Sequence, residues 1–143
     1  MTAEFSLAVH GLVYLYHHTG QTISSDALAQ NICTNPARVR KVMGILKKNG
    51  LAVSTEGKGS GYESLPDAGE ITLLQILDAL EEQVVSASWR SGSVDMDCMI
   101  ASGMADAMDE IYGGMNESCR DYLAKITIAS IDRKLVQKKA QRK

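Results

Sequence analysis

The segment between Asn35 and Gly50 constrains the fold of this chain more than any other. Asn35 is a residue type that caps helix N-termini, Pro36 suits the first helical position, and Gly50 favours a helix end. Between them, apolar side chains recur at i, i+3, i+4 and i+7, the spacing of one buried helical stripe: Val39, Val42, Met43 and Leu46. The sequence predicts an amphipathic helix over about 36–49.

The face of this helix opposite the stripe carries cations separated by small residues. At about 100° per residue, it holds Ala37, Lys41, Gly44 and Lys48, with Arg38 and Arg40 on its flanks. A glycine in a helix interior costs about 1 kcal/mol relative to alanine, so Gly44 does not serve stability. Small residues would let the backbone approach a polyanion, and the DNA major groove, about 12 Å wide, admits one helix. An ordinary amphipathic helix with a basic surface is the alternative.

Charge is distributed unevenly along the chain. The net charge of −2, from 15 Lys and Arg against 17 Asp and Glu in 143 residues, argues at face value against nucleic-acid binding. However, all six cations of residues 1–65 fall between Arg38 and Lys58, residues 66–124 hold twelve anions and two cations, and residues 125–143 hold seven cations and one anion. This asymmetry predicts that the region from Arg38 to Lys58 meets a polyanion.

The segments before and after the basic helix predict two further helices and a β-hairpin. Apolar periodicity predicts a helix over about 3–18, and a second helix beginning near Ser24 or Ser25 and reaching Ile32. After the basic helix, 51–53 and 62–65 alternate like paired strands around a glycine-rich connection that contains Lys58. We expect a mainly helical winged helix-turn-helix, with the third helix in the major groove and the hairpin beside it.

The C-terminal half predicts a long helix that a domain of this size cannot cover. Thr72 and Gln75 form a capping-box pattern for a fourth helix, and a polar connection follows over 86–97. Apolar residues then recur at coiled-coil-like steps, which predicts a dimer interface with a second copy through Ile100, Met104, Ile111, Met115, Cys119 and Tyr122. Gly113-Gly114 predicts a kink or a close helix approach, and Thr127 caps a last helix to about Lys139. The expected domains are 1–82 for DNA binding, 83–97 as a connecting loop and 98–143 for dimerisation.

In the order and spacing of its motifs, the chain resembles the Rrf2 family of small bacterial winged-helix repressors. The matching stretches are SSDALA at 24–29, TNPARVR at 34–40, LKKNGL at 46–51, GSGY at 59–62 and EITLLQILDALE at 70–81. The resemblance implies a homodimer joined by the long helix, and binding of double-stranded operator DNA through the third helix and the wing. The expected DNA-binding residues are Ser25, Thr34, Asn35, Pro36, Ala37, Arg38, Arg40, Lys41, Lys48 and Lys58.

Two departures from the family pattern matter. Glu56 stands in the wing where a cation is usual. Cluster-binding members carry three cysteines ahead of the long helix, whereas this chain has only Cys98 there, with Ala101 where some members have a fourth ligand. Because an iron–sulfur cluster needs about four protein ligands, the chain resembles the cluster-lacking branch, with no cofactor expected.

The three cysteines are not equivalent, and their odd number fits a reducing compartment. Cys119 is expected in the core, between Met115 and Tyr122 on the apolar stripe. Cys33 and Cys98 lie near helix N-termini, where a thiolate is favoured, and are the candidate sensors of an oxidant or electrophile. An inert structural role is the alternative for both.

Other functions find little support in the sequence. No apolar run reaches the roughly 18–20 residues of a membrane span, and no signal peptide is recognisable, so we expect a cytoplasmic protein. The histidines form no metal site, no nucleophile–base constellation indicates an enzyme, and the acidic middle segment reads as a solvated surface. A winged-helix protein-interaction adaptor and a cluster-dependent regulator remain the alternatives to a thiol-sensing repressor.

Overall fold

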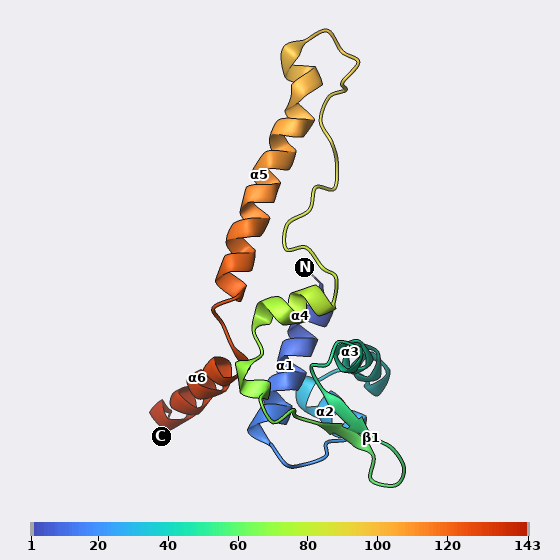
Figure 1. Cartoon of the computed structure of the whole chain (residues 1–143), viewed down its shortest axis with the longest axis vertical. Coiled ribbons are helices and arrows are strands. Elements are labelled where there is room, and N and C mark those ends of the chain that lie inside the picture. The colour runs from blue at the N-terminus through green and yellow to red at the C-terminus, as the bar shows by residue number, and fades with distance from the viewer. Residues whose placement is uncertain (1, 143) are drawn as a thin grey trace.

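The computed structural model describes residues 2–142, which form a mainly helical fold with one two-stranded hairpin (Figure 1). The elements in chain order are α1 (Ala3–His17), α2 (Ser25–Ile32), α3 (Pro36–Lys48), β1 (Val53–Thr55), β2 (Gly61–Glu63), the 3-10 turn η1 (Ala68–Glu70), α4 (Leu73–Ala79), α5 (Met99–Leu123) and α6 (Ile128–Gln141).

One hydrophobic core joins α1 to α4 with the hairpin. The apolar stripe predicted for α3 is confirmed, because Val39, Val42, Met43 and Leu46 are all completely buried. They pack with Leu12 and Leu15 of α1, Leu28 of α2 and Ile76 of α4. Burying each of these side chains contributes about 1.5–3 kcal/mol, so the amphipathic pattern of α3 fixes which face of that helix remains outside.

The first strand of the hairpin begins two residues further along the chain than the alternation of 51–53 predicts. β1 pairs with β2 in antiparallel register, Val53 opposite Glu63 and Thr55 opposite Gly61. The prediction was wrong because Leu51 and Ala52 are buried in the core and the Leu51 amide bonds to the Leu46 carbonyl at 2.9 Å. Leu51 and Ala52 therefore follow the end of α3 as part of the core and do not belong to the hairpin. The second strand spans 61–63, where the sequence pattern predicted 62–65.

α5 projects away from α1–α4 as one continuous helix of 25 residues, with the connection that precedes it running alongside (Figure 1). Gly113 and Gly114 lie inside this continuous helix, and a Cβ built on either meets no atom of this chain within 4 Å. A row of large apolar side chains on α5 is exposed, namely Met99, Ile100, Met104, Ile111, Met115 and Tyr122. Among residues 2–142, no helix is long and apolar enough to cross a membrane.

After α5 the chain returns to the N-terminal elements. The Leu73 amide donates to the Ile126 carbonyl at 3.0 Å, and the Ile128 amide to the Ile71 carbonyl at 2.9 Å. Ile128 is completely buried, and α6 packs against α1 and η1. The predicted caps are confirmed, because Thr72 with Gln75 and Thr127 with Ser130 form capping boxes at the starts of α4 and α6.

Candidate nucleic-acid interface

A tight turn sets the start of α3 against α2. The Asn35 side chain accepts a hydrogen bond of 2.9 Å from the Arg38 amide, and Pro36 occupies the first turn, as the sequence predicts. Cys33 ends α2 in the left-handed conformation, with φ of 66°, and the Thr34 amide bonds to the Ala29 carbonyl at 2.9 Å. α2, this turn and α3 form a helix-turn-helix.

The outer face of α3 is open to solvent over its whole length. Ala37, Arg38, Arg40, Lys41, Gly44 and Lys48 are all exposed, opposite the buried stripe. A Cβ built on Gly44 meets no atom within 4 Å, so nothing inside this chain requires a glycine there. This face can therefore approach a flat or grooved polyanion closely.

Two of the α3 cations contact neighbouring elements. Arg40 Nη1 lies 3.4 Å from the hydroxyl of Ser25 at the start of α2. Arg38 Nη2 lies 3.8 Å from a carboxylate oxygen of Glu4. The Thr2 hydroxyl, the Glu4 backbone amide and the charges of Lys41 and Arg38 hold the pKa of Glu4 below its usual value. The first turn of α1 thus places one carboxylate beside the basic face.

The hairpin is fixed beside the helix-turn-helix and extends the same side of the molecule (Figure 1). Tyr62 of β2 is partly buried, which raises the pKa of its hydroxyl, while the nearby charge of Arg40 opposes that shift. At the tip, Gly57 and Gly59 adopt φ of 91° and 79°, and Lys58 between them is exposed. The structure therefore places the wing beside the helix-turn-helix, with Lys58 exposed at the tip of the wing.

The cysteines occupy three separate places. Cys33 is exposed in the α2–α3 turn, and Cys98 is exposed at the N-cap of α5. Amide groups of Ala101 and Ile100 in the first turn of α5 lower the pKa of the Cys98 thiol. The expected core position of Cys119 is wrong for the single chain, because α5 projects from the core and leaves this side chain half-buried.

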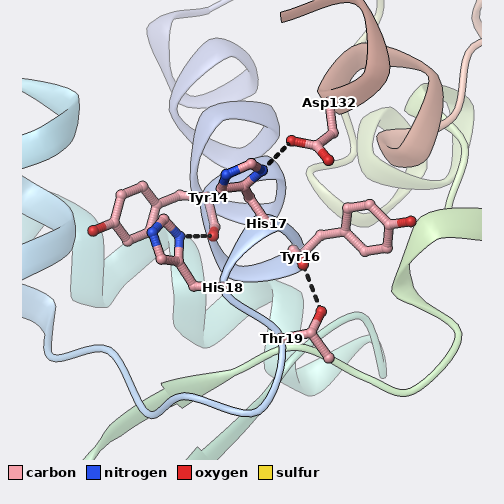
Figure 2. A network of polar contacts seen from close by, with 6 residues as sticks. All are labelled: Tyr14, Tyr16, His17, His18, Thr19 and Asp132. Carbon is pink, nitrogen blue, oxygen red and sulfur yellow. Dashed lines mark hydrogen bonds and ion pairs between the residues drawn. The ribbon is translucent and has the colours of Figure 1, made fainter. Parts of the chain in front are cut away.

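Two hydrogen-bonded histidine pairs were not predicted from the sequence. His10 Nε2 lies 2.7 Å from Asn31 Oδ1, and His17 Nδ1 lies 2.7 Å from Asp132 Oδ1, the second pair being drawn in Figure 2. His10 and His17 are seven residues apart and share one face of α1. This spacing is the sequence signal that both side chains point toward neighbouring elements on the same side of the helix. Within the described part of the chain, no three His, Cys, Asp or Glu side chains group as metal ligands.

Comparison with known proteins gives consistent matches over nearly the whole chain. The family model described as Rrf2, iron-dependent transcriptional regulator, matches residues 1–134. The candidate HTH-type transcriptional regulator YwnA of Bacillus subtilis (strain 168) is 22% identical over 131 residues, covering 92% of this chain and 96% of that protein.

Solved structures share the fold. A candidate transcriptional regulator from Lactobacillus plantarum superposes with a TM-score of 0.81 at 24% identity, covering 100% of both chains. CymR, the global cysteine regulator of B. subtilis, superposes with a TM-score of 0.69 at 17% identity, covering 93% of this chain and 95% of that one. With the helix-turn-helix, wing and long C-terminal helices in this order, the chain belongs to the Rrf2 family, whose members are DNA-binding transcriptional regulators and not enzymes.

Proposed function

We propose that this regulator is a homodimeric, sequence-specific repressor that reads its operator with α3 and the wing. The observation that carries the proposal is the solvent-exposed α3 face, where Lys41 and Lys48 flank Gly44 opposite a completely buried stripe. Base contacts would come from the N-terminal half of this face and phosphate contacts from its flanks and the wing. The proposed DNA-binding residues are Ser25, Thr34, Asn35, Pro36, Ala37, Arg38, Arg40, Lys41, Lys48 and Lys58.

The exposed row on α5 supports a homodimer. Ile100, Ile111 and Tyr122 are 67%, 53% and 66% exposed in the single chain, on a helix that leaves the core. Monomeric proteins rarely expose contiguous apolar surface of this kind, and a second α5 would cover it. Residues 98–143 would then provide dimerisation and residues 1–82 DNA binding, with 83–97 as the connection between them.

The donor set of the chain does not fit an iron–sulfur cluster, although the family description names iron. Cys98 begins α5, Cys119 lies 21 residues further along the same helix, and Cys33 belongs to the α2–α3 turn. At about 1.5 Å per residue, Cys98 and Cys119 are about 30 Å apart, far beyond the size of one cluster. We therefore propose that the protein works without a cluster, as a member of the cluster-lacking branch.

A thiol switch is the proposed signal input. Cys98 is exposed and its thiol pKa is lowered, which are the two conditions for reaction with oxidants. Hypochlorite would oxidise the Cys98 thiolate to a sulfenic acid, releasing chloride, and condensation with the Cys33 thiol of a second copy would give a disulfide and water. A covalent change at the start of α5 would alter the spacing of the two DNA-binding units.

Footprinting on the chain's own promoter tests the DNA-binding proposal. We expect a protected site of dyad symmetry that is lost after mild hypochlorite and retained in Cys98→Ser. Lys41→Glu should strongly weaken protection, and the binding that remains should have a salt slope smaller by about one unit. Lys134→Glu on α6 is the matched control, because it makes the same charge change away from α3. Unchanged promoter binding by Lys41→Glu would favour a protein-interaction adaptor.

A further inference from the structure

One carboxylate stands at the edge of the proposed DNA-binding surface. Glu4 belongs to the first turn of α1, and its Oε1 atom lies 3.8 Å from the Nη2 atom of Arg38 on α3. Among residues 2–142, this is the only ion pair that a cation of α3 makes. A surface that would meet the phosphates of DNA therefore carries an anion of its own, and phosphate binding by itself does not require one.

The fold fixes the position of this carboxylate. Phe5 and Leu7, which follow Glu4 on α1, are buried in the core, and α1 packs against α3. The Thr2 amide donates a hydrogen bond of 3.1 Å to the Glu82 carboxylate, which ties the start of α1 to the segment after α4. The helix dipole also favours an acidic side chain in the first turn. Glu4 is therefore part of the folded surface beside α3.

Glu4 is ionised, and solvent reaches its contact with Arg38. The Thr2 hydroxyl, the Glu4 backbone amide and the charges of Lys41 and Arg38 lower the pKa of Glu4, so its carboxylate is charged at neutral pH. The Glu4 side chain is 30% exposed and that of Arg38 is 43% exposed. Ion pairs that water and salt reach in this way are weak, so a DNA phosphate can compete with Glu4 for Arg38.

The length of the contact shows that Glu4 acts on Arg38 through its charge. The separation of 3.8 Å exceeds the roughly 2.7–3.2 Å of a hydrogen bond. Charge-assisted pairs that fix the direction of an arginine are shorter, about 2.7–2.9 Å, and are frequently bidentate. Glu4 thus leaves the direction of the guanidinium free, while it offsets the positive potential that a phosphate would meet there.

We propose that Glu4 limits the affinity of this regulator for DNA of any sequence. Its carboxylate occupies Arg38 and repels the phosphate that Arg38 and Lys41 would otherwise contact. Phosphate contacts supply essentially all non-specific binding and carry no sequence information. Weakening them makes operator recognition depend on the base contacts of α3 and keeps the chain from being held on other DNA. This role rests on the proposed function, because it requires that the α3 face meets DNA.

Fluorescence anisotropy with Glu4→Gln tests the proposal, with the full chain, a duplex from its own promoter and a scrambled duplex of the same composition. At 0.1 M monovalent salt, we expect Glu4→Gln to bind both duplexes about eight-fold more tightly, because one further neutralised phosphate steepens the salt slope by about 0.9. Glu117→Gln, the same change at an exposed position of α5, is the matched control and should bind both duplexes as the wild type does.

Two further variants separate charge from other effects of the substitution. Glu4→Asp keeps the charge and should retain the wild-type salt slope. In an Arg38→Gln background, Glu4→Gln should strengthen binding less than three-fold, because the cation that it would release is absent. Circular dichroism of each variant verifies that the fold is intact.

The outcomes distinguish this role from the proposed function. Equal salt slopes for the wild type and Glu4→Gln would overturn the role of Glu4. Weaker promoter binding by Glu4→Gln, with unchanged binding of the scrambled duplex, would also overturn it, because Glu4 would then orient Arg38 for base reading. If neither the wild type nor Glu4→Gln binds the promoter duplex, the proposed function itself fails, and the role of Glu4 fails with it.

Discussion

Tyr62 and Ile23 exchange two backbone hydrogen bonds, with 2.8 Å from the Tyr62 amide to the Ile23 carbonyl and 2.9 Å in the reverse direction. This bridge attaches the wing to the segment that leads into α2. Gly61 lies at the closest point of the approach, where a Cβ would be only 2.4 Å from the Ile23 carbonyl oxygen. A glycine at this position lets the wing sit against the helix-turn-helix.

Gly61→Ala should therefore destabilise the fold. Because the clash is with backbone atoms, the hairpin must shift, and we expect the free energy of unfolding to fall by about 1–3 kcal/mol, as for other overpacked sites. Urea unfolding followed by circular dichroism measures the change. Wild-type stability in this variant would contradict the close approach of β2 to Ile23.

Gly44→Ala is the matched substitution on α3, and it should act in the opposite direction. A Cβ at Gly44 meets no atom within 4 Å, and alanine is favoured over glycine in a helix, so stability should rise by up to about 1 kcal/mol. The same methyl group would stand between the proposed reading helix and DNA. Fluorescence anisotropy with operator DNA should show several-fold weaker binding by this more stable variant. Unaltered affinity would argue against a close approach of the α3 backbone to the groove.

Ile111→Lys should weaken the proposed dimer. Ile111 is 53% exposed on the apolar row of α5, and covering such a side chain contributes about 1.5–3 kcal/mol, so the dimer dissociation constant should rise at least ten-fold. Light scattering over a dilution series measures this constant. Glu117→Lys, at an exposed position of α5 away from the apolar row, is the control and should remain dimeric. Equal dissociation of both variants would show that the interface lies elsewhere.

Cys98 should react at a lower pH than an ordinary cysteine. Because helix-start amides lower its pKa in the folded chain, the thiolate forms below the usual value of about 8.5, and the alkylation rate should rise through a midpoint below that pH. Iodoacetamide labelling, quantified by mass spectrometry from pH 5 to 10, locates the midpoint. The urea-unfolded chain supplies the reference. Coincident midpoints for folded and unfolded chains would remove the basis of the thiol switch.

Local sequence chemistry anticipated the helices and their ends. The structure confirms the cap at Asn35, the proline after it and the buried stripe from Val39 to Leu46. Each of these features depends only on residues within one or two helical turns of each other. The same reasoning predicted the winged helix-turn-helix and the long C-terminal helix. It predicted the strand start wrongly, because alternation over 51–53 cannot reveal that Leu51 and Ala52 belong to the core.

The sequence by itself determined the helical pattern, the exposed basic face of α3 and the apolar row of α5, since helical periodicity alone assigns residues to faces. Only the tertiary structure decided what those faces meet. It placed α6 on α1 and paired His17 with Asp132 across 115 positions of sequence. It also left Cys119 half-buried on a projecting helix. The physical reason is that side-chain periodicity records which face is apolar, whereas the partner of that face depends on how distant elements pack.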